Sequence, residues 1–305
     1  MFRRIINKVE SIYQYRYLSR NEKASYNFLL KNVFKGTDIE FLEKVWQLDH
    51  FREVLDLQEI NKKKLKKVLI LAPHQDDEVI GCGGLLKKLV DQGSEVHIGF
   101  LTDGAELSNP IESVVTRRKE AENLCNYLKV GVRNLEVCNI NLKINKYHIE
   151  TLTSWFREDW DAIFTVWPVD HPPKHRLCAY MVGKALKNSA KKDFPLYLYG
   201  VHTDVLANFY EDITDVIDEK ADLINFYPSQ MQAQRYDHLS RGLDAWRSRF
   251  LPVSNEPRFI ETFFRIPIEA YDDFQSVFDK SNINKLFKGH EACIRSFHII
   301  KKIKN

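Results

Sequence analysis

Hydrophobic residues recur along most of the chain in two alternating patterns. Short runs of β-branched and leucine residues, typical of buried parallel strands, are separated by amphipathic segments with helical spacing. The predicted strands are Lys67–Leu71, Glu95–Leu101, Leu135–Ile140, Ala162–Trp167, Pro195–Val201 and Phe259–Ile266. The predicted helices are Gly81–Asp91, Glu112–Leu128, Tyr147–Arg157, His175–Lys187, Val216–Phe226 and Gln232–Ser248. Strands that alternate with helices of this length predict βαβ units, and therefore an α/β, Rossmann-like domain with a mostly parallel sheet and flanking helices.

The residues before the first predicted strand show only helical patterns. The apolar residues of segments 5–13 and 26–34 each fall on one helix face. Thr37 and Glu40 resemble a capping box that starts a third helix, and a lysine-rich stretch then leads into the first strand. The predicted domains are a helical extension, residues 1–65, and a main domain, residues 66–305.

Composition and charge narrow the function classes. The 305 residues are 44% hydrophobic and carry a net charge of +3. This even balance argues against nucleic-acid binding, because readers of nucleic acid concentrate basic residues on one face. The five cysteines form no C-x-x-C pair, which argues against a disulfide scaffold and favours a reducing, cytoplasmic location.

No secretory signal or membrane span is expected, since the basic N-terminus has no long apolar run after it and no stretch approaches the ~20 apolar residues that a span needs. The basic excess of residues 1–67 and of residues 298–304 leaves contact with a membrane surface as an alternative. Such charge runs usually form solvated faces.

Ionisable residues follow the first predicted strand directly, in the segment Ala-Pro-His-Gln-Asp-Asp-Glu at positions 72–78. Burying so many ionisable groups is costly unless a cation compensates their charge. His74 and Asp77 offer an imidazole nitrogen and a carboxylate oxygen to a metal such as Zn²⁺, which leaves Asp76 to accept a proton from water. The alternative is an acidic helix start favoured by the helix dipole. The glycines at 81, 83 and 84 also admit a phosphate cradle, but the acidic loop would repel an anion.

A second polar loop follows the fourth predicted strand and reads Trp-Pro-Val-Asp-His-Pro-Pro-Lys-His-Arg at positions 167–176. Ligands of open α/β sheets bind beyond the carboxyl ends of the strands, so this loop should lie near the first one. A catalytic zinc site uses three protein ligands and keeps one position open. His74, Asp77 and either His171 or His175 meet that count.

The two loops resemble those of the PIG-L/LmbE superfamily of metal-dependent N-deacetylases, which includes the GlcNAc-phosphatidylinositol, mycothiol-pathway and bacillithiol-pathway deacetylases. Segment 73–78 resembles its (A/P)HPDDE motif, with Gln75 in place of the usual proline. The resemblance covers about residues 66–266. Further matches are Thr102-Asp103-Gly104 with the TDG motif, Arg117 to Ala121 with the RxxEA helix, and Lys220-Ala221 with Ser229-Gln230 in the K-A…H-x-S-Q segment, where Tyr227 replaces a common histidine.

The resemblance implies a metal centre and a general base. By their positions in the family motifs, His74, Asp77 and His175 are the expected metal ligands, and Asp76 is the expected base. Zn²⁺ is the expected ion, and Fe²⁺ or another divalent transition metal is the alternative, because both suit two imidazoles and a carboxylate.

The resemblance also implies residues that contact the substrate. The family places a second histidine three residues before its last ligand, where this chain has Pro172. We assign the role of that histidine, polarising the scissile carbonyl, to His171, with Asp170 or no residue as the alternatives. Arg117 and Asp103 are expected to bind the substrate, and the alternative for Arg117 is an exposed charge on a helix face.

The expected reaction is removal of an N-acetyl group from an amino sugar or sugar conjugate by activated water, without a covalent intermediate. The sugar could be free or linked to a nucleotide, a lipid or a polymer. Two alternatives are an amidase acting on a non-sugar amide, which the same site would cleave, and a non-catalytic carbohydrate- or partner-binding relative. Retention of Asp76 argues against the non-catalytic alternative, since mere binding has no use for a base.

Overall fold

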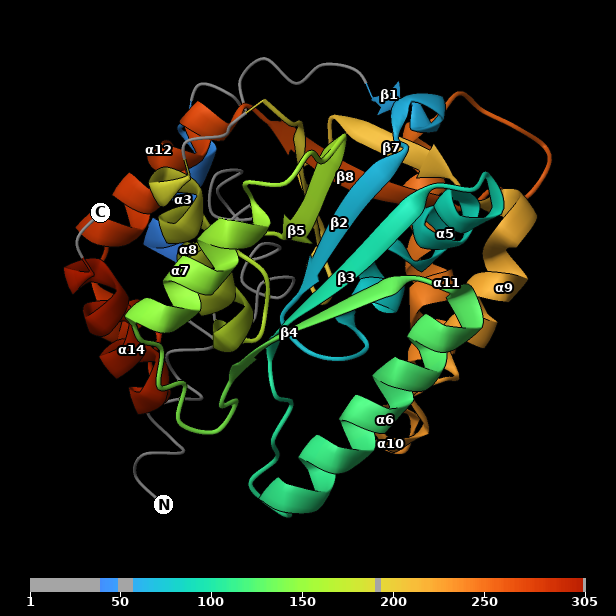
Figure 1. Cartoon of the computed structure of the whole chain (residues 1–305). Coiled ribbons are helices and arrows are strands. Elements are labelled where there is room, and N and C mark those ends of the chain that lie inside the picture. Colours follow the sequence, from blue (N-terminus) through green and yellow to red (C-terminus); the bar gives the residue numbers. More distant parts are fainter. Residues whose placement is uncertain (1–38, 49–56, 190–192, 304–305) are drawn as a thin grey trace, which may run out of the picture.

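The computed structural model describes residues 39–48, 57–189 and 193–303 (Figure 1). The helices predicted in segments 5–13 and 26–34, and Thr37 of the predicted capping box, lie outside these residues. The third predicted helix is present as α3 (Ile39–Trp46). Its buried Phe41 lies with its ring centroid 4.9 Å from that of Phe278 in the C-terminal part of the chain. The proposed boundary between residues 65 and 66 stays a prediction.

One eight-stranded sheet forms the centre of the molecule, in the order β1-β7-β8-β6-β5-β2-β3-β4. In sheet order, the five neighbouring strands β4, β3, β2, β5 and β6 pair in parallel. Strand β8 runs antiparallel to both β6 and β7. The strands are β1 (Gln58–Glu59), β2 (Lys67–Ala72), β3 (Glu95–Thr102), β4 (Gly131–Val137), β5 (Ala162–Val166), β6 (Leu196–Tyr199), β7 (Phe209–Asp212) and β8 (Ile260–Ile266).

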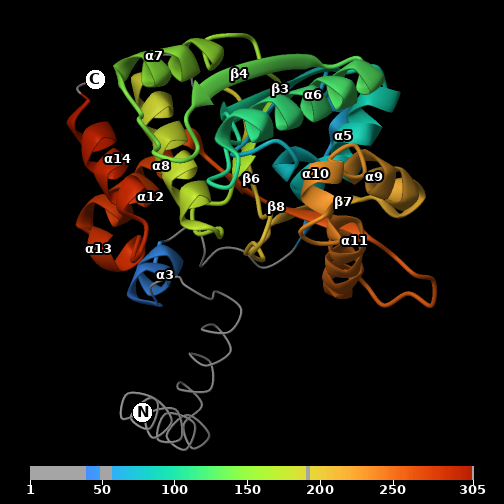
Figure 2. The same cartoon turned by 90° about the horizontal axis from the view of Figure 1, so that it is seen from below.

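Helices cover both faces of the sheet, so the architecture has three layers (Figure 2). On one face lie α5 (Asp77–Asp91), α6 (Pro110–Leu128), α9 (Ile217–Ile224), α10 (Pro228–Met231) and α11 (Tyr236–Arg247). On the other lie α3, α7 (Lys146–Trp155), α8 (Pro173–Asn188), α12 (Ile268–Lys280), α13 (Ile283–Leu286) and α14 (Glu291–Lys302). This confirms the expected α/β fold with flanking helices.

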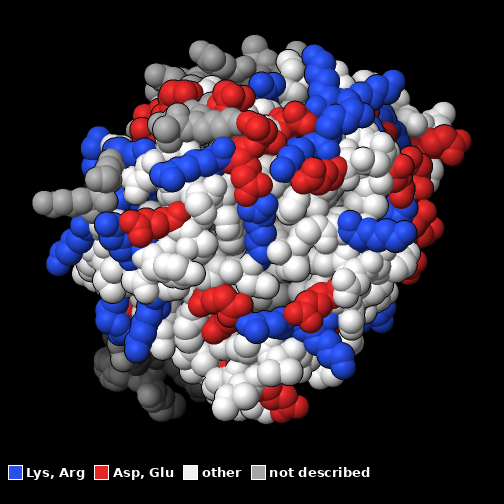
Figure 3. All heavy atoms as spheres, viewed as in Figure 1, with Lys and Arg blue, Asp and Glu red and all other residues white. Residues whose placement is uncertain are grey.

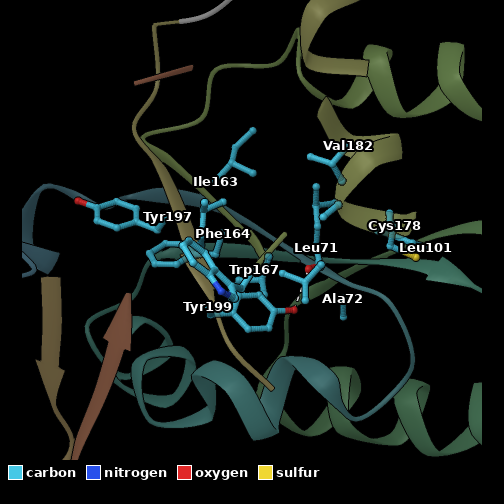
Figure 4. Close-up of a cluster of buried hydrophobic side chains, with 14 of the residues drawn as sticks. Leu71, Ala72, Leu101, Ile163, Phe164, Trp167, Cys178, Val182, Tyr197 and Tyr199 are labelled. Carbon is cyan, nitrogen blue, oxygen red and sulfur yellow. Dashed lines mark hydrogen bonds between the residues drawn. The ribbon is translucent and has the colours of Figure 1, made fainter. Parts of the chain in front are cut away.

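The core explains why the central strands are almost wholly apolar. Helices on both sheet faces bury every residue of β5 and all but the first of β2. Aromatic residues fill the space beside them (Figure 4), where Phe164 stacks on Tyr197 with ring centroids 4.8 Å apart. The buried Tyr199 hydroxyl donates a hydrogen bond of 2.8 Å to the carbonyl of Leu71, so its one polar atom is satisfied.

Several expected boundaries were wrong. The edge strand β4 begins four residues earlier than predicted and ends at Val137, because its alternating exposure hides it from a search for apolar runs. The helix expected from Gly81 begins at Asp77. Gly81 therefore lies inside this helix. A Cβ atom at this position would come within 2.2 Å of the Tyr199 ring, so glycine lets the helix pack close to the sheet.

Some elements were missed altogether. The short strands β1 and β7 and the three C-terminal helices were not expected. The helix predicted over 232–248 corresponds to α11, which begins four residues later, at Tyr236. A mostly parallel sheet is correct, but its β7–β8 end is antiparallel. β8 pairs with β6, and β7 and then β1 complete the sheet on the side away from β4.

Basic and acidic side chains are interspersed on the face shown in Figure 3. Of the helices in the described residues, none combines the length and the apolar character needed to cross a bilayer.

The strand order positions the functional site. The chain runs outward from β2 to β3 on one side, whereas β5 pairs with the other side of β2. Such a switch point leaves a crevice beyond the carboxyl ends of the two inner strands. The loop after β2 carries His74, and the loop after β5 leads to His175 at the start of α8.

Candidate metal centre and active site

Three side chains converge at this switch point. The Nδ1 atom of His74 lies 3.2 Å from Oδ2 of Asp77 and 3.1 Å from Nε2 of His175. The Asp77 oxygen lies 3.3 Å from that same Nε2 atom. The three predicted ligands are therefore brought together from two loops, although 101 positions separate the two histidines.

These separations fit a divalent transition metal. Bonds of 2.0–2.1 Å place ligand atoms about 3.3 Å apart at a tetrahedral ion and about 3.0 Å apart at an octahedral one. Two imidazole nitrogens and one carboxylate oxygen suit zinc or iron and disfavour magnesium or calcium, which prefer oxygen ligands. Three protein ligands also leave a coordination position for water or substrate.

Asn139 sets which nitrogen of His74 faces the centre. Its Oδ1 lies 3.0 Å from Nε2 of His74, while its Nδ2 donates to the carbonyl of Ala105 at 3.0 Å. Because the amide orientation is fixed by Ala105, Oδ1 accepts the proton of Nε2, and the lone pair of His74 is then on Nδ1. Asp103 holds this arrangement, since its Oδ1 accepts the backbone N–H of Asn139 at 2.8 Å.

Asp170 does the same for His175. Its carboxylate is fully buried, and Oδ2 lies 2.9 Å from Nδ1 of His175. Nδ1 is therefore the protonated nitrogen, and Nε2 presents its lone pair to His74 and Asp77. Asn139 and the orienting role of Asp170 were not foreseen from the sequence.

The electrostatics of the three ligands favour a bound cation. Burial lowers the pKa of His74, which keeps its ring neutral and able to bind a metal. Burial also acts to lower the pKa of His175, but the carboxylates of Asp77 and Asp170 outweigh it and raise the pKa to about 10. The negative charge of these carboxylates, Asp77 beside Nε2 and Asp170 at Nδ1, would also favour a metal ion at Nε2.

Asp76 has an unusual backbone that a buried network supports. Its φ of 125° lies in a region that only glycine adopts readily, at a cost of about 1–3 kcal/mol. The Glu78 carboxylate accepts the backbone N–H of Asp76 at 3.1 Å and also accepts a hydrogen bond from the Tyr227 hydroxyl. Burial raises the pKa of Glu78 to about 7. Tyr227, which replaces a common family histidine, thus holds the acidic loop in place.

The Asp76 carboxylate differs from its neighbours in having no hydrogen-bond partner among the described residues. Asp77 and Glu78 both accept hydrogen bonds, whereas the Asp76 carboxylate accepts none from the residues that the structure describes. Its side chain is 7% exposed, and burial together with the charge of Asp77 raises its pKa. The acidic helix start and the metal loop are therefore one segment: Asp77 and Glu78 open α5, while Asp76 stays available to a small molecule.

His171 lies beside this centre without joining it. It is half-buried, burial lowers its pKa, and its Nδ1 is a buried nitrogen with no hydrogen-bond partner in the described part of the chain. Its predicted contact with the scissile carbonyl stays a prediction.

Arg117 is buried, which rules out the alternative of an exposed helix-face charge. Its guanidinium donates to Oε1 of Glu106 at 3.0 Å and to the side-chain oxygen of Gln230. One turn further along α6, Glu120 accepts the N–H of Ser229 at 2.9 Å and its hydroxyl at 2.6 Å. The RxxEA and S-Q motifs are therefore paired in space. Both Arg117 and Asp103 have protein partners for their side chains. Their predicted contacts with a substrate stay predictions.

Replacing Asn139 by alanine should weaken metal binding about 10- to 100-fold, because His74 would lose the acceptor that fixes its tautomer. Competition with a chelating dye would measure the affinity. Asn134→Ala, an exposed change on β4, is the matched control. An Asn139→Ala affinity equal to that of the control would show that His74 needs no such acceptor.

Fold and site together define a Rossmann-like α/β protein with a His–Asp–His cluster of metal-ligand geometry at the carboxyl edge of its sheet. Residues 69–186 match the family model described as PIG-L, GlcNAc-PI de-N-acetylase. Residues 69–186 therefore carry the PIG-L family match that the motifs implied.

Individual relatives agree with this assignment. The diacetylchitobiose deacetylase of Thermococcus kodakarensis is 26% identical over 189 residues, which cover 54% of this chain and 70% of that protein. The structure of an N,N'-diacetylchitobiose deacetylase from Pyrococcus horikoshii with its inhibitor MPG superposes with a TM-score of 0.59 at 25% identity, covering 82% of this chain and 95% of that one. A 4-carboxy-2-hydroxymuconate hydratase from Pseudomonas putida shares the fold, with a TM-score of 0.55 at 17% identity over 66% of this chain and 96% of that one.

Proposed function

We propose that this protein is a divalent-metal-dependent N-deacetylase that hydrolyses the acetamido group of an N-acetylated amino sugar or sugar conjugate. The observation that carries the proposal is the convergence of His74, Asp77 and His175 beside an Asp76 carboxylate that no described residue engages. The similarity to two diacetylchitobiose deacetylases supports a sugar amide as the substrate.

His74, Asp77 and His175 would hold the metal, for which we propose zinc, with iron(II) as the alternative. When bound, the ion supplies Lewis-acid activation of water and of the acetamide carbonyl. Asp76 accepts a proton from the attacking water as the new C–O bond forms. Asp76 then returns that proton to the nitrogen as the C–N bond breaks, which yields acetate and a free amine. No covalent link to the protein is needed.

The surrounding residues position these groups. Asn139 and Asp170 hold the two imidazoles in the tautomers that present a lone pair, and Glu78 holds the backbone of Asp76. A further imidazole near the centre would donate a hydrogen bond to the carbonyl oxygen, the role that the sequence suggested for His171. Because the P. putida hydratase shares the fold, the fold alone does not fix the reaction.

Acetate release from a small substrate panel tests the proposal. Zinc-loaded and iron(II)-loaded protein would be given N-acetylglucosamine, N,N'-diacetylchitobiose, a nucleotide-linked N-acetylglucosamine and a lipid-linked one. We expect saturable, metal-dependent acetate release from at least one of them. Fully metal-loaded protein that releases acetate from none of them, but cleaves a non-sugar acetamide, would establish the amidase alternative instead.

A further inference from the structure

The loop after β6 is tied to the metal centre by a single buried carboxylate. Asp170, which orients His175, also accepts the backbone N–H groups of Val201 at 3.2 Å, His202 at 3.1 Å and Thr203 at 2.9 Å. The Thr203 hydroxyl adds a fourth bond of 2.7 Å to the same carboxylate. A buried carboxylate with this many donors is rigidly held, so the loop is fixed relative to His175.

The turn that begins this loop is also fixed by close packing. A Cβ atom on Gly200 would lie 2.1 Å from the backbone oxygen of Thr203. Only glycine allows so close an approach, so the backbone at Gly200 can fold back against Thr203. The backbone of His202 is therefore held by Asp170 and by the turn at Gly200.

The ring of His202 lies beside the ring of His175. Its centroid is 5.5 Å from that of the His175 ring and 5.9 Å from that of Tyr236, which meets it edge-on at 60°. His202 is exposed, and neither of its ring nitrogens is hydrogen-bonded to a described residue. An imidazole held beside a metal ligand with both nitrogens free is placed to meet a molecule bound at the centre.

His171 is less well placed for that contact. Its Nδ1 is buried, and within the described residues its ring shares no ring contact with His74 or His175. The exposure of His202 and its ring contact with His175 favour it over His171 as the imidazole that contacts a bound substrate.

We propose that His202 donates a ring N–H to the carbonyl oxygen of the substrate's acetamido group, the contact that the sequence suggested for His171. This inference rests on the proposed deacetylase function. A neutral imidazole carries one N–H and needs no change of protonation to donate it. The bond would strengthen as negative charge develops on that oxygen, which lowers the barrier. Tyr236, packed edge-on against the ring, would limit its rotation.

Kinetics of paired variants test the contact. His202→Ala should lower kcat about 10²–10³-fold, the usual cost of losing one such donor, with unchanged metal content and melting temperature. His202→Gln, which keeps an N–H donor, should recover part of the loss. His238→Ala, an exposed change on α11, is the control. A His202→Ala enzyme within about threefold of wild type, beside a His171→Ala enzyme that loses activity, would overturn the proposal.

Binding of acetohydroxamate to the zinc-loaded protein gives a readout that does not depend on turnover. Calorimetry should show a Kd about 3- to 10-fold higher for His202→Ala than for wild type, as expected for the loss of one hydrogen bond. If wild type cleaves no substrate but this difference appears, the deacetylase proposal fails, and only the donor role of His202 toward a bound carbonyl group stands. If wild type cleaves the substrate while both kcat and Kd are unchanged in His202→Ala, the contact fails and the deacetylase proposal stands. If wild type cleaves nothing and the Kd is unchanged, both fail.

Discussion

Asp76→Asn should lower kcat by about 10²–10⁴-fold while leaving metal content and stability close to wild type. Asparagine has nearly the same size and can occupy the same space, but its amide cannot accept a proton from water. The expected loss is specific because the Asp76 carboxylate makes no hydrogen bond to any described residue that the change would break. Metal analysis together with steady-state kinetics on the substrate found by the panel would measure it.

The matched control for this change is Asp91→Asn, which alters an exposed carboxylate at the other end of α5. It should retain wild-type kcat. A rise in KM with unchanged kcat for Asp76→Asn would mean that Asp76 binds the substrate rather than moving its proton. Full activity in Asp76→Asn would remove the general base from the proposed mechanism.

His175→Ala should abolish tight metal binding. It removes one of three ligands, so the fall in affinity should exceed the ~10–100-fold typical of losing an outer-shell partner. Activity should fall at least ~10²-fold, since the ion's contribution amounts to several kcal/mol. Equilibrium dialysis followed by elemental analysis would give the metal content, and acetate release would give the activity.

Chelation of the wild-type protein separates loss of the ion from damage to α8. The chelated protein should lose activity and regain it when zinc or iron(II) is restored, whereas His175→Ala should not recover. His298→Ala, an exposed histidine on α14, should behave as wild type in both assays. Wild-type protein that stays fully active after its metal has been removed would contradict a metal-dependent mechanism.

The parallel half of the fold could be predicted because its signals are local. Each central strand is a short apolar run, and each following helix has its own periodicity. The β7–β8 end gives weaker signals, because β7 is a half-buried strand of four residues whose pairing depends on distant segments. By contrast, α12 carries Tyr271, Phe274 and Phe278 at helical spacing, so periodicity could have revealed it.

The site shows the same contrast between local signals and contacts of distant segments. His74, Asp77 and Asp76 lie in one short segment, and the family motif supplied His175 as the third ligand. The partners of these residues could not be predicted in that way. Asn139 meets His74 across 65 positions, and Tyr227 meets Glu78 across 149 positions. Such hydrogen bonds depend on the completed fold, although the place of Asn139 just after β4 was a usable signal.

The C-terminal helices bear on how far this protein can be truncated. Arg176 donates to the carbonyl of Leu286 at 3.2 Å, and the Tyr180 hydroxyl donates to Asp279 at 2.9 Å. Both donors lie on α8, within two turns of His175, yet both acceptors lie far beyond the stretch that matches the family. The segment that matches the family therefore depends on contacts from outside it. A shortened version that ended at β8 would keep every metal ligand and lose the C-terminal helices that brace the third one.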